Sequence, residues 1–249
     1  MNKENIKVHI LGCWGAFPKA GDACSGVLIQ ADGKNYVFDI GFGVFSKLRE
    51  KIEIRDIEAV FISHLHYDHM GDAAALEYHS NYLSRTGQLK KKIDIYAPPS
   101  PQDLHRQVEY PFVNTCAVEE GFSYQGGAVT IEAIPVSHTV ECYAYCIKAF
   151  GKKIVYYTDT VFREQDIAFI KDADLFICEA TITEGSKHTI GAGHMSDYEA
   201  GKLAALSNAK RLCLYHLPGD IDINQIYEHA KTEYGGELYL SAETREYMI

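Results

Sequence analysis

The stretch FISHLHYDHMGDAAAL, residues 61–76, decides the fold. His64, His66, Asp68 and His69 fall within six residues of it, between a short apolar run and a segment of helix-forming composition. A polar surface turn could carry such residues by chance. Alternatively they form half of a metal site, because imidazole and carboxylate groups bind zinc, manganese or iron in proteins. The other half of such a site would then have to lie elsewhere in the chain.

Four apolar runs with the composition of β-strands end in a histidine or an aspartate. The run AVFIS precedes His64, and the runs IPVS, IVYYT and RLCLY precede His138, Asp159 and His216. The end of a strand can hold a ligand rigidly without burying an unpaired charge. One such residue would more often be structural, but four of them, together with the HxHxDH pattern, favour a metal site.

The spacing of these residues fits two ions. In a turn, His64 and His66 can face one side while Asp68 and His69 face another, so that two clusters form side by side. Asp159 can bridge the clusters because a carboxylate has two oxygens. Two metals about 3.5–4 Å apart can share a hydroxide and stabilise both oxygens of a displacement reaction. We expect two divalent ions, zinc first, with manganese or iron as alternatives.

The pattern of segments predicts a layered α/β protein. The chain has 249 residues, of which 47% are apolar and 23% charged, as expected for one domain over residues 1–249. Strand-like and helix-like segments alternate, with β-hairpins interspersed. Helices are expected to begin near Asp72, at Ser100 and at Ser196, where Glu199 completes a capping box.

The composition also argues against several classes of protein. No run reaches 18 consecutive apolar residues, so we expect no membrane span. The first ten residues lack the apolar region and cleavage site of a secretory signal, which predicts a cytoplasmic location. The seven cysteines include no CxxC pair and are expected to be free thiols. The formal charge of −10 disfavours long nucleic acid as a partner, because proteins that bind it usually need a basic face.

The segment HLHYDHMGD resembles the HxHxDHxxG signature of the metallo-β-lactamase superfamily. Later segments match in order: VSH at residues 136–138, YTDT at 157–160 and LYH at 214–216. The resemblance covers nearly the whole chain, and it implies a four-layer αββα sandwich with two sheets face to face and helices outside. It also implies an assignment of the ligands. The first metal would be bound by His64, His66 and His138, the second by Asp68, His69 and His216, with Asp159 as the bridge.

A finer resemblance points to the ribonuclease Z-like branch, whose members carry a glutamate in a motif similar to CEAT and a histidine in a motif similar to HMS. These are Glu179 and His194 here. The resemblance implies that His194 stabilises an oxyanion or protonates the leaving oxygen, that Glu179 orients its ring, and that Asp68 serves catalysis beside them. The plain alternatives are a salt-bridged carboxylate and a loop histidine near a helix cap. Thr158 departs from the family, which often has glycine before the bridging Asp159, and we expect a small backbone adjustment there.

Four functions remain open. They are hydrolysis of small or cyclic phosphodiesters by a metal-bridging hydroxide, tRNA 3′ processing, hydrolysis of an ester, lactone, thioester or β-lactam, and metal-dependent binding without catalysis. Ribonuclease Z enzymes that bind tRNA carry an arm between the third histidine and the bridging aspartate, but here residues 139–158 have the pattern of a plain hairpin. All seven ligands are present, which a binding protein would not need. We therefore expect a phosphodiesterase with a small-molecule substrate, no membrane partner, a loop at 186–194 over the site, and a homodimer as an alternative to a monomer.

Overall fold

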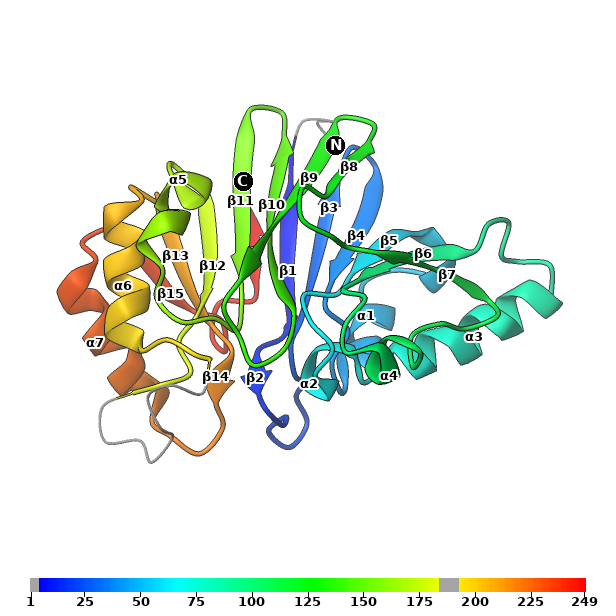
Figure 1. The fold of residues 1–249 in the computed structure, drawn as a ribbon, viewed down its shortest axis with the longest axis horizontal. Helices are drawn as coiled ribbons and strands as arrows, with labels where there is room; N and C mark the ends of the chain where they lie inside the picture. The colour runs from blue at the N-terminus through cyan, green and yellow to red at the C-terminus, as the bar shows by residue number, and fades with distance from the viewer. Residues whose placement is uncertain (1–4, 184–192) are drawn as a thin grey trace.

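The computed structural model describes residues 5–183 and 193–249. Most of the first half of the chain forms a seven-stranded sheet, which the C-terminal strand completes at one edge (Figure 1). In spatial order its strands are β16 (Glu246–Met248), β1 (Lys7–Gly12), β3 (Gly26–Ala31), β4 (Lys34–Phe38), β5 (Ile57–Phe61), β6 (Ile93–Ala97) and β7 (Val113–Ala117). The strands from β4 to β7 run parallel, so polar residues that follow β4 and β5 emerge at the same edge of the sheet.

The second half of the chain forms another seven-stranded sheet. Its strands are β15 (Glu237–Leu240), β13 (Arg211–Tyr215), β12 (Leu175–Glu179), β11 (Lys152–Tyr157), β10 (Cys142–Ala149), β9 (Val129–Val136) and β8 (Ser123–Gly126). The strands from β11 to β15 are parallel and those from β8 to β11 antiparallel. β10 and β11 form the plain hairpin that the sequence predicts. A two-residue strand, β2 (Trp14–Gly15), pairs with β14 (Leu217–Pro218) and links the two halves.

The two sheets pack face to face through large aromatic side chains. The ring of Phe38 on β4 lies 5.6 Å from that of Tyr145 and 6.1 Å from that of Tyr156, both on the opposite sheet. All three are fully buried. Both tyrosine hydroxyls find acceptors: Tyr145 donates to the carbonyl of Ile62 at 2.8 Å, and Tyr156 donates to the Asp39 carboxylate at 2.7 Å. Burial of these rings is therefore not opposed by unpaired polar groups.

Helices cover the outer faces of the sheets (Figure 1). Their bounds are α1 (Val44–Arg49), α2 (Tyr67–Met70), α3 (Ala73–Arg85), α4 (Gln102–His105), α5 (Ile167–Ile170), α6 (Asp197–Leu206) and α7 (Ile223–Glu233). The helix α3 lies over the first sheet, and α6 and α7 lie over the second. The predicted αββα sandwich is confirmed.

Two of the three predicted helix starts are confirmed, and the third helix is much shorter than expected. α3 begins next to Asp72, and α6 has the full capping box between Ser196 and Glu199. The segment SPQDLHRQVEY, residues 100–110, has the composition of one longer helix, and this prediction is wrong in extent, because α4 covers only Gln102–His105 and buries none of its residues. A short helix without a buried face lacks the packing that stabilises helices in proteins.

Within residues 5–183 and 193–249, every helix is too short or too polar to cross a membrane. The seven cysteines are free, as predicted.

Candidate metal centre

The predicted ligands, which lie between positions 64 and 216 of the sequence, meet at one edge of the sandwich. β5, β9, β11 and β13 run in the two sheets so that His64, His138, Asp159 and His216 follow them at the same end. α2, which carries Asp68 and His69, begins directly after His66. The parallel order of β11 and β13, with β12 between them, accounts for the approach of residues so far apart in sequence.

One group of donor atoms comprises His64, His66, His138 and Asp159, whose ligand atoms all lie within 4.8 Å of one another. Nδ1 of His66 lies 2.9 Å from Nε2 of His64 and 3.2 Å from Nε2 of His138. Oδ2 of Asp159 lies 3.7 Å and 3.8 Å from the same two Nε2 atoms. Three imidazole nitrogens and an oxygen that converge in this way match a tetrahedral N/O site for a divalent cation.

A second group comprises Asp68, His69 and His216, whose donor atoms also lie within 4.8 Å of one another. Oδ2 of Asp68 lies 3.2 Å from Nε2 of His216 and 3.6 Å from Nε2 of His69. The other oxygen of Asp159, Oδ1, lies 3.4 Å from Nε2 of His69 and 3.5 Å from Nε2 of His216. Asp159 therefore directs one oxygen to each group, which is the placement that a bridging carboxylate requires.

Groups outside the two clusters fix the orientation of four of the five histidines. Each of these groups forms a hydrogen bond with Nδ1 of one histidine, so that Nε2 of the same ring faces the clusters. Hydrogen bonds of this kind orient metal-binding histidines. The pairs are His64 with Ser63 Oγ at 3.1 Å, His69 with Asp39 Oδ2 at 2.7 Å, His138 with the carbonyl of Gly193 at 2.8 Å, and His216 with Thr181 Oγ1 at 2.8 Å. Seven nitrogen and oxygen donors, preoriented and mostly buried, fit divalent metal ions without any thiolate.

Asp39 is a site residue that the sequence interpretation missed. Its side chain is fully buried, and besides His69 it accepts hydrogen bonds from the amide and hydroxyl of Ser63, at 2.6 Å and 2.8 Å, and from Tyr156. The available signal was the same as for the ligands, because Asp39 follows the apolar run NYVF. Its carboxylate acts on the site through the ring of His69.

We expect Asp39→Asn to lower metal affinity about 10–100-fold, the usual effect of losing a carboxylate that supports a metal-binding histidine. Competition with a chromophoric chelator measures this affinity. Asp94→Asn is the matched control, because Asp94 lies on β6 of the same sheet and pairs with Lys91 at the surface. Equal metal affinity in both variants would contradict the role of Asp39.

The backbone at two ligands has a conformation that non-glycine residues seldom adopt. Asp159 has φ of 35° and His216 has φ of 51°. Left-handed backbone at such residues is strained and is found disproportionately at functional sites.

Thr158, the departure from the family pattern, donates a hydrogen bond from Oγ1 to Oδ1 of Asp159 at 2.6 Å. Gly15 allows close approach of β2, since a Cβ there would lie only 2.0 Å from Cε1 of His216.

His194 and Glu179 form the hydrogen-bonded pair that the family resemblance implies. Nδ1 of His194 lies 3.0 Å from Oε2 of Glu179, whose buried carboxylate also accepts the amide hydrogen of Thr160 at 2.5 Å. The His194 ring lies 5.0 Å from that of His138 and 5.4 Å from that of His216. His194 is thus beside both clusters. The rest of the loop predicted to lie over the site, residues 186–192, falls outside the described residues.

The charge of His194 depends on opposing effects. Burial alone would lower its pKa, but the hydrogen bond and charge of Glu179, together with the charge of Asp159, outweigh burial and raise the pKa to about 9 in the absence of metal charge. Glu179 and Asp159 thus favour the protonated form of the ring. An imidazolium beside a metal centre can donate a hydrogen bond or a proton to a reacting oxygen.

Comparisons with known proteins agree with this geometry. The model of the beta-lactamase superfamily domain matches residues 34–217. The probable metallo-hydrolase YhfI of Bacillus subtilis is 32% identical over 242 residues, which cover 95% of this chain and 97% of that protein. The crystal structure of YhfI, described as a metallo-beta-lactamase fold protein, superposes with a TM-score of 0.93 at 30% identity, covering 98% of this chain and 100% of that one.

More distant structures share the fold. Human tRNase Z, short form, gives a TM-score of 0.75 at 22% identity, with 98% of each chain covered. A diphosphatase from the PhnP family gives a TM-score of 0.78 at 19% identity, with 98% of this chain and 97% of that one covered. The family match and the relative at 32% identity establish what the sequence motifs and the histidine–aspartate clusters indicate: this chain belongs to the metallo-β-lactamase superfamily of hydrolases.

Proposed function

We propose that the protein is a dinuclear metal-dependent phosphodiesterase that acts on small or cyclic phosphodiesters. The observation that carries this proposal is the His194–Glu179 pair placed beside two donor groups that share Asp159. Bound divalent cations would activate water for attack and offset the negative charge of the diester. Zinc is the first choice for the N/O donor set, with manganese or iron as alternatives.

The residues of the chain have separate roles in this proposal. Asp159 would bind a cation in each donor group through its two oxygens, and Asp68 would bind the cation held by His69 and His216. Glu179 accepts a hydrogen bond at Nδ1 of His194, which leaves Nε2 of that ring as the donor for a bound diester. His194 then protonates the leaving oxygen as its bond to phosphorus breaks. A positioned general acid of this kind typically contributes about 10²–10⁴-fold in rate.

The size of the substrate is inferred from the hairpin β10–β11 and from charge. The two strands join at Phe150 and Gly151, so the segment between His138 and Asp159 contains only this hairpin. An arm that could hold tRNA would have to be inserted in this segment. The net charge of −10 adds repulsion that grows with each phosphate bound, whereas a diester carries a single charge.

At this level of identity the likeness to human tRNase Z and to a PhnP-family diphosphatase establishes the fold alone, and the names of both proteins are consistent with phosphoester chemistry. Site-specific tRNA 3′ processing and hydrolysis of an ester, lactone or thioester are the competing functions of the same fold. We place neither long nucleic acid nor a membrane among the partners, and we keep a homodimer as an alternative to a monomer.

A panel of substrates tests the proposal with metal-reconstituted protein. We expect the highest kcat/KM for a nitrophenyl phosphodiester or a cyclic nucleotide, and little cleavage of precursor tRNA at matched salt and metal. Efficient cleavage of the tRNA at one site would favour the ribonuclease function. Turnover of a lactone or thioester without turnover of any diester would favour the carboxylic-ester function instead.

A further inference from the structure

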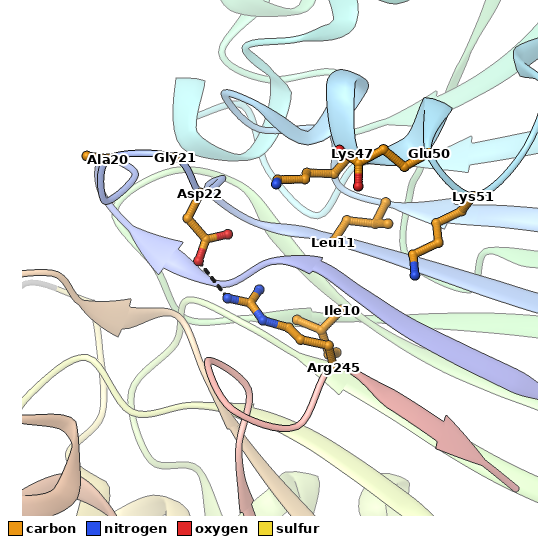
Figure 2. A pocket seen from close by; sticks show the side chains of 9 residues that line it. All are labelled: Ile10, Leu11, Ala20, Gly21, Asp22, Lys47, Glu50, Lys51 and Arg245. Carbon is orange, nitrogen blue, oxygen red and sulfur yellow. Dashed lines mark hydrogen bonds and ion pairs between the residues drawn. The ribbon is translucent and has the colours of Figure 1, made fainter.

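A cavity separate from the metal centre lies between β1, α1 and the C-terminal segment (Figure 2). Its volume is about 400 Å³, within the range of pockets that bind small molecules. Ile10 and Leu11, each only 4% exposed, form an apolar floor. Lys47, Lys51 and Arg245 line the cavity around this floor (Figure 2). None of the predicted metal ligands lines this cavity.

The charge of this cavity is opposite to that of the chain. The chain carries 34 acidic and 24 basic residues, yet the cavity is lined by three cations and two carboxylates, Asp22 and Glu50. Both oxygens of Asp22 are already engaged, because Oδ2 accepts hydrogen bonds from Arg245 at 2.6 Å and from the indole of Trp14 at 2.7 Å, and Oδ1 accepts one from the amide of Ala23 at 2.9 Å. The negative charge of Asp22 is therefore offset by these donors in the wall of the cavity.

The cations of the cavity retain unused donors. Lys51 pairs with Glu246 at 2.9 Å, a carboxylate that also accepts from Lys7 at 3.3 Å and does not line the cavity. Within residues 5–183 and 193–249, no ion pair or hydrogen bond engages the ammonium group of Lys47. Arg245 donates from Nη2 to Asp22 and from Nε to the carbonyl of Ala242, and an arginine has five N–H donors.

We propose that this cavity binds a small organic anion through a phosphate group, at a site distinct from the metal centre. Lysine and arginine donors around a phosphate form charge-assisted hydrogen bonds, which are about twice as strong as neutral ones. Ile10 and Leu11 close the bottom of the cavity, and the aliphatic stems of Lys47 and Lys51 offer apolar surface to the organic part of the ligand. The proposal goes beyond the phosphodiesterase function and does not depend on it.

Trp14 provides a direct signal for this site, because it is the single tryptophan of the chain. Its indole donates to Asp22, which is held in turn by Arg245, and the ammonium of Lys19 lies 4.0 Å from its ring centre. A phosphate bound to the remaining donors of Arg245 places negative charge beside the hydrogen bonds that join Arg245, Asp22 and Trp14, and so changes the electrostatic surroundings of the indole. Tryptophan fluorescence therefore reports occupation of the cavity independently of catalytic turnover.

The test is a fluorescence titration of the metal-loaded protein with inorganic phosphate, glycerol 3-phosphate and adenosine 5′-monophosphate. The proposal expects a saturable change with Kd below about 1 mM for at least one organic phosphate. Lys47→Ala should weaken this binding about tenfold or more, and Lys47→Glu should abolish it. Lys90→Glu is the matched control, since Lys90 is an exposed lysine beside another surface groove. Tighter binding of an organic phosphate than of inorganic phosphate identifies an organic ligand.

Two results would overturn the proposal. One is the absence of any saturable change for the three phosphates. The other is a change that is equal in Lys47→Glu and wild-type protein and disappears on metal chelation, which would place the phosphate at the metal centre. Neither result bears on which substrate the metal centre hydrolyses, so the substrate panel and its conclusion are unaffected.

Discussion

Replacing Asp159 with alanine is expected to lower turnover about a hundredfold or more, equivalent to a loss of roughly 3 kcal/mol of transition-state stabilisation. The two oxygens of Asp159 face different donor groups, with Oδ2 near His64 and Oδ1 near His69. Without it, neither ion has its shared ligand and their separation is no longer fixed. Elemental analysis after reconstitution should give fewer than two metals per chain, against two for the wild type.

The fold should survive this change, because the strand before Asp159 packs into the core through its apolar side chains. Ile154, Val155 and Tyr156 of β11 are fully buried, and none of them depends on the carboxylate. Circular dichroism and thermal unfolding check this point. Asp159→Asn is the matched variant, since an amide keeps one coordinating oxygen and should retain more metal than alanine. Full turnover with two metals in Asp159→Ala would refute the bridging assignment.

The sequence was most informative where a ligand follows a strongly apolar strand. His138, Asp159 and His216 each follow such a run, and the structure brings all three to the clusters. This works because the order of parallel and antiparallel strands places their ends at one edge, whatever their separation in sequence. The capping box at Ser196 was equally reliable, because its two hydrogen bonds are local and need no distant partner.

The contacts between the ligands and the residues that support them could not be predicted in this way. Asp39 reaches His69 across 30 positions and Tyr156 across 117, and Thr181 reaches His216 across 35. Such contacts depend on how the two sheets pack, and an isolated aspartate or threonine in a sequence gives no sign of its partner. Gly15 is similar. A side chain at this position would clash with the imidazole of His216, and this clash becomes visible only when the two segments are packed together.

Replacing His194 with alanine is expected to lower turnover by roughly 10²–10⁴-fold while two metals remain bound. His194 is adjacent to the donor groups, but its Nδ1 is committed to Glu179 at 3.0 Å and lies 3.9 Å from Asp159. The seven other donors are complete without it. Turnover and elemental analysis of the same preparation therefore separate catalysis from metal binding.

The control for this change is His229→Ala. His229 also pairs with a buried carboxylate, that of Asp197 at 2.9 Å, but it lies on α7 and belongs to neither donor group. It should keep turnover close to that of the wild type. If both variants lost activity equally, the loss would come from lower stability of the fold. That result would contradict a specific role of His194 in catalysis.

The dependence on the leaving group identifies what His194 does. A nitrophenolate leaves without protonation, whereas an alkoxide or a ribose oxygen needs a proton as its bond to phosphorus breaks. If His194 is the general acid, the loss in His194→Ala should be small for a nitrophenyl diester and large for an alkyl or nucleoside diester. Equal losses for both would mean that His194 positions the diester or stabilises its charge without transferring a proton. Loss of one metal in the variant would make His194 a ligand, in keeping with its place near Asp159 and His216.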